Sequence, residues 1–217
     1  MNSQLIALLG TSLLETLLMV GVSGGIAVVA GIPLGVILVV TERGALLQNP
    51  GLNRVLALVI NATRSVPFII LMVAIIPFTR LIAQTSIGTT AAMVPLSVAA
   101  IPFMARIAEN ALREIDPGLI TAARAMGASP LQIIVKVLLP ESLPGLVAGV
   151  IVTLVSLIGY SAMAGAIGGG GLGDMGIRYG YQRFLPEVML AVVVVLILLV
   201  QAMQSLGDWL VRRISHR

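Results

Sequence analysis

Side chains that could perform catalysis are scarce in this chain of 217 residues. It contains no cysteine and a single histidine, His216, close to its end. The lack of cysteine excludes a disulfide scaffold, an iron–sulfur cluster and a cysteine-ligated zinc site. No serine–histidine pair and no acidic cluster of the kind that holds a catalytic metal is evident. We therefore expect a chain that is not an enzyme and has neither a metal site nor a cofactor of its own.

One glycine motif resembles a nucleotide fingerprint. Gly168, Gly170 and Gly173 fit the pattern G-x-G-x-x-G, and Gly171 lies between them. The dinucleotide motif needs a preceding strand in a βαβ unit, whereas an apolar helix is expected here. No Gly-Lys-Ser/Thr occurs, so the chain has no P-loop. The sequence therefore predicts a mobile or tightly turned loop over residues 164–181, where another molecule approaches the backbone.

The composition excludes most soluble proteins. Hydrophobic residues make up 58% of the chain and charged residues 10%, whereas soluble domains carry about 25% charged residues. So few charges could not solvate a soluble enzyme or a disordered tail. The basic balance rests on a net charge of only +4, so we expect no nucleic acid partner. The expected surroundings are a lipid bilayer.

Five apolar segments are long enough to cross a bilayer, which needs about 20 helical residues. An all-α, polytopic membrane protein with a single transmembrane domain over residues 1–217 is therefore predicted. The expected spans are residues 15–40, 55–79, 86–106, 141–166 and 187–211.

Lysine and arginine residues set the expected orientation. With the N-terminus outside and the C-terminus in the cytoplasm, the cytoplasmic segments hold nine of them, Arg217 included, and the outer segments hold three. This bias follows the positive-inside rule. Arg64 lies inside the second span, where we expect a structural role, with contact to a substrate carboxylate as the alternative.

The expected spans offer no route for protons. Glu15, Glu141 and Glu187 lie at span ends, and no aspartate lies within a span. Proton-coupled carriers use intramembrane carboxylates or histidines, and no inverted repeat of a secondary transporter is evident. Any uphill transport would therefore take its energy from another subunit.

Glycine pairs and prolines indicate close packing and bending. Small residues four apart let helices approach in lipid, either within one chain or between two copies. Four prolines could kink the spans. The pairs are Gly21–Gly25, Gly31–Gly35 and Gly145–Gly149, and the prolines are Pro33, Pro67, Pro95 and Pro102.

Two stripes of polar and large side chains are candidates for a translocation pathway, with interhelical hydrogen bonding as the alternative. Met163, near the outer end of the fourth span, is the candidate gate, because a flexible thioether can repack; an ordinary core methionine is the alternative. The stripes are Thr153, Ser156, Tyr160 and Met163 in the fourth span, and Asn61, Ser65, Phe68 and Met72 in the second.

The cytoplasmic segment 109–141 carries strong helix-end signals. Asp116 with Pro117 predicts a helix start, and Gly127 predicts its end. Ser129 and Gln132, around Pro130, are spaced as a capping box. Two short helices are therefore expected, and the first docks either into a groove on a partner or onto lipid headgroups.

The same segment resembles the EAA loop of ABC importer permeases. The run Thr121-Ala122-Ala123-Arg124-Ala125-Met126-Gly127 is followed, after nine residues, by Val137-Leu138-Leu139-Pro140. Thr121 replaces the usual glutamate and Val137 the usual isoleucine. Further similarity to methionine importer permeases covers residues 64–71, 76–80, 159–163 and 170–173.

This resemblance implies a five-span type I ABC permease with a cytoplasmic coupling loop over residues 109–140. It implies a homodimer in a bacterial inner membrane, with two cytoplasmic ATPase subunits that hold ATP and magnesium, and an extracytoplasmic binding protein that meets the glycine loop. It also implies methionine, in both enantiomers, as the substrate. Another small cargo, or a scaffold that transports nothing, remains an alternative.

Overall fold

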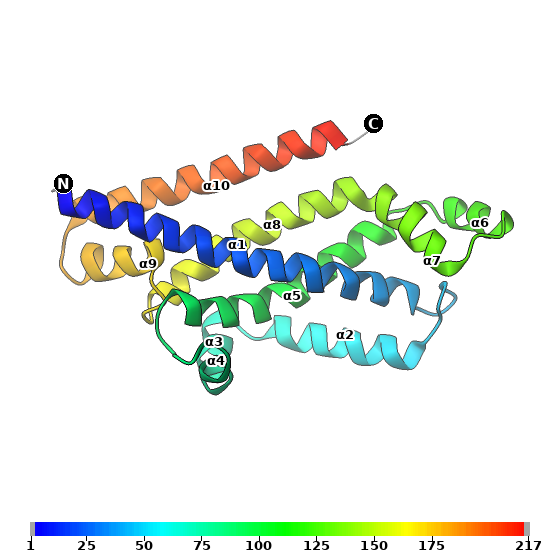
Figure 1. Ribbon diagram of the computed structural model, residues 1–217, viewed down its shortest axis with the longest axis horizontal. Coiled ribbons are helices and arrows are strands. Elements are labelled where there is room, and N and C mark those ends of the chain that lie inside the picture. The colour runs from blue at the N-terminus through cyan, green and yellow to red at the C-terminus, as the bar shows by residue number, and fades with distance from the viewer. Residues whose placement is uncertain (1–2, 215–217) are drawn as a thin grey trace.

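The computed structural model describes residues 3–214, so His216 and Arg217 lie outside the described residues. All regular structure in this part of the chain is helical. Four helical segments are long and apolar enough to cross a membrane: α1 (Ser3–Val40), α5 (Thr89–Arg113), the stretch Pro130–Gly165, and α10 (Pro186–Ile214). They run roughly parallel along the long axis of the molecule (Figure 1).

The predicted second span is not one straight helix. It forms α2 (Pro50–Ser65), α3 (Phe68–Ala74) and α4 (Ile76–Ala83), with a bend of 103° between α2 and α3. Pro67 cannot donate a backbone hydrogen bond, and it disfavours helical backbone at Val66, which is extended with ψ 126°. The prolines inside α1, α5 and α8 (Leu139–Gly165), in contrast, leave those helices continuous.

Short helices occupy the two ends of the molecule. At one end lie α6 (Pro117–Ala125), α7 (Pro130–Ile133) and the π-helical turn η1 (Ile134–Leu138) that leads into α8. At the other end lie α9 (Gly171–Met175) and the π-helical turn η2 (Gly176–Tyr181), beside the first turns of α1 (Figure 1). The described chain therefore starts at the α9 end and finishes at the α6 end.

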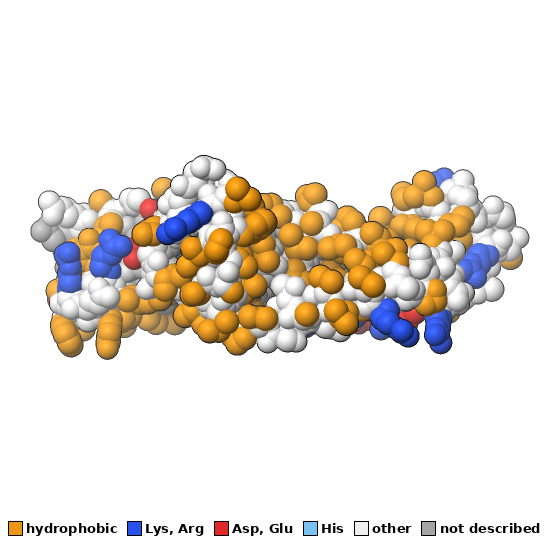
Figure 2. Space-filling model, turned by 90° about the horizontal axis from the view of Figure 1, so that it is seen from below, with side chains coloured by type: hydrophobic (Ala, Val, Ile, Leu, Met, Phe, Trp, Pro, Cys, Tyr) orange, Lys and Arg blue, Asp and Glu red, His pale blue; other side chains and the backbone are white. Residues whose placement is uncertain are grey.

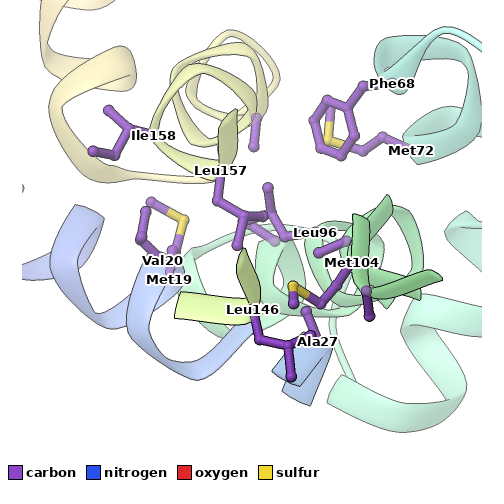
Figure 3. Packing of buried hydrophobic residues seen from close by; sticks show 14 of the residues in the cluster. Met19, Val20, Ala27, Phe68, Met72, Leu96, Met104, Leu146, Leu157 and Ile158 are labelled. Atoms are coloured by element: carbon purple, nitrogen blue, oxygen red, sulfur yellow. The ribbon is translucent and has the colours of Figure 1, made fainter. Parts of the chain in front are cut away.

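The core forms where α1, α5 and α8 meet. Met19, Leu96, Met104 and Leu157 are fully buried there, and Figure 3 shows side chains from these helices converging, with Phe68 and Met72 of α3 beside them. Much of the remaining hydrophobic surface is exposed, and Val29 and Leu198 are examples. Figure 2 shows hydrophobic side chains filling the middle of one face, with lysines and arginines toward its ends.

Glycines set how closely α1 approaches its neighbours. A Cβ atom on Gly35 would lie 2.7 Å from the Ala105 carbonyl oxygen and from the Ala108 Cβ, and Gly31 is equally confined by α5. Gly145 and Gly149 of α8 are similarly confined by α5. These two pairs therefore pack within the chain, as the first reading of the motif predicted. Gly21 and Gly25 are exposed, and a Cβ there would meet nothing within 4 Å.

Candidate functional site

The helix ends of the coupling loop form as the sequence predicts. The Asp116 carboxylate accepts a hydrogen bond from the Gly118 amide at 2.8 Å and caps α6. After α6, Gly127 adopts φ 79°, a left-handed conformation that favours glycine. The Ala128 amide then donates to the Ala123 carbonyl at 3.1 Å. Ser129 and Gln132 form the capping box of α7, with Pro130 at its first position.

The inner face of α6 is held by the bundle. Ala123 is 4% exposed and packs in a cluster with Leu112 of α5, Ile133 of α7 and Leu138 of η1. Pro140 then lies in the first turn of α8. Because α7, η1 and α8 follow one another without a loop, the cluster that packs against α6 is continuous with α8.

The outer face of α6 lacks such contacts. Met126 is 81% exposed, and Thr121, Ala122 and Arg124 are exposed as well. The Thr121 hydroxyl donates to the Pro117 carbonyl of its own helix at 3.0 Å, so it is occupied locally. The outer face of α6 therefore presents a small, mostly uncharged surface with one cation, Arg124.

The predicted stripe in the second span is divided by the bend. Asn61 and Ser65 are exposed on α2, where the Ser65 hydroxyl donates to the Asn61 carbonyl at 2.8 Å. Phe68 and Met72 lie beyond the bend on α3 and are buried. The prediction that these four residues share one helix face is therefore wrong, because Pro67 ends α2. Whether they line a pathway remains a prediction.

The second predicted stripe runs from the interior to the surface. Thr153 is 1% exposed, and its hydroxyl donates to the Gly149 carbonyl at 2.8 Å and lies 3.4 Å from the Met104 sulfur. The half-buried Ser156 donates to its own helix. Met163 is 48% exposed at the far end of α8.

Aromatic stacking brings residues of the two stripes together. The rings of Phe68 and Tyr160 stack with centroids 4.8 Å apart and an interplanar angle of 11°. This contact joins α3 to α8, and it explains how α3 is held against the bundle after the bend. Arg64 is exposed in the last turn of α2, where a cation is favourable at the helix C-terminus.

The glycine loop is tightly turned and anchored. Gly168, Gly170 and Gly171 have positive φ values between 77° and 85°, and a Cβ on Gly173 would collide with the Ala162 backbone. The Gly168 carbonyl accepts from the Gly88 amide at 2.9 Å. Of the two expectations for residues 164–181, the tight turn describes residues 166–170, whereas residues 171–181 form α9 and η2, where the sequence predicted a loop.

Two residues of α1 that the sequence did not single out for this role hold the loop. The Glu15 carboxylate accepts from the Gly171 amide at 2.7 Å, and the Thr16 hydroxyl oxygen accepts from the Leu172 amide at 2.9 Å. The sequence placed Glu15 at a span end, whereas α1 begins at Ser3 and carries Glu15 well inside the helix. Because these two acceptors lie far from their donors in the sequence, no local sequence pattern could have predicted the contact.

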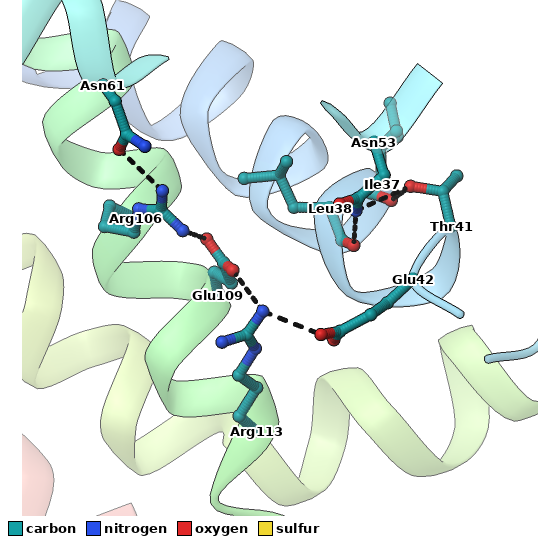
Figure 4. Close-up of polar contacts among 9 residues, drawn as sticks. All are labelled: Ile37, Leu38, Thr41, Glu42, Asn53, Asn61, Arg106, Glu109 and Arg113. Atoms are coloured by element: carbon teal, nitrogen blue, oxygen red, sulfur yellow. Dashed lines mark hydrogen bonds and ion pairs between the residues drawn. The ribbon is translucent and has the colours of Figure 1, made fainter. Parts of the chain in front are cut away.

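A buried carboxylate lies at the α6 end of α5, where the sequence indicated none within a span. Glu109 is 2% exposed. It forms ion pairs with Arg106 and, at 2.7 Å, with Arg113, whose guanidinium also lies 3.3 Å from Glu42 (Figure 4). Arg106 donates to the Asn61 side chain at 2.6 Å. α5 continues to Arg113, past the predicted end of the span at residue 106, and these charges pair with one another in its last turns.

The network ties three helices together at one end of the bundle. Figure 4 shows Asn61 of α2 and Glu42, just after α1, reaching the α5 residues from two sides. In a second contact, the Asn53 amide donates to the Leu38 carbonyl at 2.6 Å. Among residues 3–214, no group of three histidine, aspartate or glutamate side chains is placed to hold a metal ion.

Curated relatives resemble the chain over nearly its full length. It is 58% identical over 210 residues to the probable D-methionine transport system permease protein MetI of Vibrio cholerae, covering 97% of this chain and 93% of that protein. It is 50% identical over 217 residues to the probable MetI protein of Pasteurella multocida, with both chains covered completely.

Solved structures agree with the fold. A chain of the MetNI methionine ABC transporter in inward-facing conformations superposes with a TM-score of 0.97, at 52% identity and with complete coverage of both chains. A chain of an amino acid ABC transporter crystallised with histidines has a TM-score of 0.80 at 18% identity, covering 96% of this chain and 94% of that one, which supports the fold alone. The predicted all-α fold of a type I ABC permease is thus confirmed.

The family comparison covers most of the transmembrane bundle. The model of the binding-protein-dependent transport system inner membrane component matches residues 31–216, which include the coupling loop, both predicted stripes and the glycine loop. The chain therefore belongs to the binding-protein-dependent transport system inner membrane component family, the permease subunits of ABC importers.

Proposed function

We propose that this chain forms the translocation pathway of an ATP-driven importer that brings methionine, in both enantiomers, into the cytoplasm. The observation that carries the proposal is the complete superposition on a chain of a methionine ABC transporter at 52% identity. The relatives at 50–58% identity are named as D-methionine transport permeases over nearly the same length. At such identity the substrate specificity of a transporter is expected to be shared.

The working assembly in this proposal contains two copies of the chain, two cytoplasmic ATPase subunits and one extracytoplasmic binding protein. The exposed outer face of α6 supports an ATPase contact, because its inner face is already packed and its outer face is not. The exposed Gly21 and Gly25 leave α1 a small-residue surface on which a second copy can pack. ATP and magnesium belong to the ATPase subunits.

The proposed location is the bacterial inner membrane, with the N-terminus outside and the C-terminus in the cytoplasm. The described chain starts at the α9 end and finishes at the α6 end (Figure 1), which is the arrangement this orientation requires. Arg43, Arg113 and Arg124 belong to the α6 end, whereas Arg80, Arg178 and Arg183 belong to the other. The charge distribution supports α6 facing the cytoplasm.

In the mechanism that we infer, α8 transmits movement from the α6 end of the molecule to the opposite end. The helical stretch Pro130–Gly165 has 36 residues, or about 54 Å at 1.5 Å per residue. It begins beside α6 and ends close to Met163, so ATP-driven movement of α6 would reach the outer end through one continuous helical stretch. Tyr160 would carry the same movement to α3 through its stack on Phe68.

We place the gate at the outer end of α8. Met163 is exposed within the isolated chain, so two copies could meet there and close an apolar constriction between the outside and the pathway. Asn61, Ser65, Phe68, Met72, Thr153, Ser156 and Tyr160 remain pathway candidates. The Gly168–Gly173 loop, anchored by Glu15, gives the binding protein a firm surface at the outer mouth.

Uptake in proteoliposomes tests the proposal. The permease and ATPase subunits are reconstituted with ATP inside the vesicles, and labelled L-methionine and binding protein are added outside. We expect uptake that requires ATP hydrolysis and that excess unlabelled L- or D-methionine abolishes. Uptake of labelled leucine or histidine with no competition by methionine would contradict the substrate assignment, and failure of the chain to co-purify with an ATPase would favour a scaffold.

A further inference from the structure

A cavity of about 300 Å³ lies at the α9 end of the bundle, between the α3–α4 elbow, the start of α5 and the end of α8. Its volume falls at the small end of the range for ligand sites. The walls are mostly apolar, and the polar side chains are confined to Thr79, Arg80 and Ser86. The residues that line it are Met72, Val73, Ile76, Thr79, Arg80, Ser86, Ile87, Gly88, Ala91, Ala92, Pro95, Ala164, Ile167 and Gly169.

The Thr79 hydroxyl is buried in this wall without a partner. Thr79 is 4% exposed, and its Oγ1 is the one buried side-chain oxygen or nitrogen among residues 3–214 that lacks a hydrogen bond. Other helical threonines behave differently: the hydroxyls of Thr16, Thr63 and Thr153 donate to carbonyls four residues earlier. A buried hydroxyl left unsatisfied is costly, so an acceptor brought to this wall of the cavity would stabilise it.

The rim of the cavity is cationic and is surrounded by apolar surface. The exposed Arg80 follows Thr79 directly, and its guanidinium lies 3.4 Å from the Ser86 hydroxyl. Leu81 and Ile87 beside the rim are 72% and 67% exposed. An arginine within an exposed apolar surface at the end of a membrane helix is expected to lie at the level of lipid headgroups.

These features select an anionic amphiphile. The ligand needs an acceptor for Thr79, an apolar portion for the walls and a negative group for Arg80. No carboxylate lines the cavity, so the ammonium group of an amino acid would find no counter-charge there. A phospholipid has all three features in order: a phosphate, an ester carbonyl and an acyl chain.

We propose that this cavity binds an anionic phospholipid from the leaflet at the α9 end of the protein. The phosphate pairs with Arg80 and Ser86, the ester carbonyl accepts from Thr79 Oγ1, and the first part of one acyl chain packs on Val73, Ile76 and Ile167. The small volume takes only this part of the lipid, and the rest lies along the exposed Leu81 and Ile87. The bound lipid would fix the α3–α4 elbow against α5.

Thermal unfolding of the full-length chain in nanodiscs tests this site. The probe is phosphatidylglycerol added to phosphatidylcholine nanodiscs, and the readout is the shift in unfolding midpoint, with native mass spectrometry counting retained phosphatidylglycerol. We expect phosphatidylglycerol to raise the midpoint of the natural chain. Thr79→Val and Arg80→Gln should each lower that shift at least twofold and retain less lipid.

The controls separate the site from general effects. Thr63→Val removes a hydroxyl that is satisfied on α2 and should keep the full shift, and Thr79→Ser keeps the donor and should keep most of it. A full phosphatidylglycerol shift in Thr79→Val would overturn the proposal. So would an equal shift with glycerol phosphate, which would indicate a free-anion site, or a Thr79-dependent shift with methionine, which would indicate a substrate subsite.

Discussion

Single polar side chains in this bundle stabilise the fold by bonding to other parts of the same chain. The clearest case is Glu109, which is 2% exposed and lies between two arginines of its own helix. Arg106 and Arg113 are 22% and 48% exposed, so both guanidinium groups retain contact with solvent. A carboxylate removed from water is tolerated when it is paired and hydrogen-bonded in this way.

Glu109→Gln should destabilise the protein. The amide keeps the shape but removes the negative charge that two arginines share, and it leaves hydrogen-bonding groups mismatched in a buried site. We expect a loss of about 1–3 kcal/mol in unfolding free energy, less than for a fully buried ion pair because the arginines are partly solvated. Thermal unfolding with Glu114→Gln as the exposed control measures it, and equal midpoints for the two variants would contradict the assigned role.

Residue roles were predictable where the signal is local. Asp116, Gly127 and the Ser129–Gln132 pair could be assigned from sequence because capping depends on residues within one turn. Glu15 could not, because its hydrogen-bond donor lies 156 residues away in sequence. The two arginine partners of Glu109 are local, but its burial depends on the packing of the bundle. A run of charge-free residues is a poor guide to helix ends when charges cancel at i−3 and i+4, as around Glu109.

At the scale of elements, α1 and α5 form the tightest helix pair of the fold. Gly31 and Gly35 let the α1 backbone approach Ile101, Ala105 and Ala108 of α5 within van der Waals distance. In lipid this packing replaces the hydrophobic effect as the driving force for association. The fold therefore depends on these two positions remaining glycine.

Gly35→Ala should loosen this pair. The added methyl group would lie 2.7 Å from a backbone oxygen of α5, which cannot move aside without shifting the helix. We expect a loss of about 1–3 kcal/mol, typical of overpacking. The matched control is Gly10→Ala on the same helix, where a Cβ meets nothing within 4 Å. If the unfolding midpoints of the two variants fall equally, close contact with α5 does not explain the loss, because alanine favours the helix at both positions.

Element boundaries show what hydropathy can and cannot predict. Four of the five predicted spans correspond to continuous helices, because an apolar run in a membrane has few alternatives to a helix. The fifth segment breaks at Pro67, whereas Pro33, Pro95 and Pro102 lie in continuous helices. The difference is tertiary, since Phe68 stacks on Tyr160 and Met72 is buried beside it.

At the scale of the whole molecule, a single helical stretch links the two ends. It runs from the coupling loop at Pro130 to Gly165, next to the glycine loop that α1 holds. ATP hydrolysis belongs to a separate subunit of the importer, so in the proposed mechanism the energy for movement enters at the α6 end and acts at the other. Substitutions at either end of α8 should therefore affect the same transport cycle.

Met163→Cys tests the gate in the assembled protein. The natural chain has no cysteine, so this variant carries one thiol per copy. We expect oxidation to cross-link two copies in the nucleotide-free state, and cross-linking to fall when ATP is trapped on the ATPase. Leu190→Cys, 66% exposed at the same end of the molecule, is the control. Efficient cross-linking at position 190 with none at 163 would contradict the gate.

The measurement closest to the central claim is the ratio of methionine imported to ATP hydrolysed in Gly127→Val and Gly44→Val. Both glycines have φ 79° and open space around them, so valine strains both backbones by a similar amount, about 1–2 kcal/mol. Only Gly127 ends the coupling helix. The account predicts that Gly127→Val lowers this ratio at least tenfold, whereas Gly44→Val keeps it near that of the natural protein. An unchanged ratio in Gly127→Val, or an equal loss in both variants, would contradict coupling through α6.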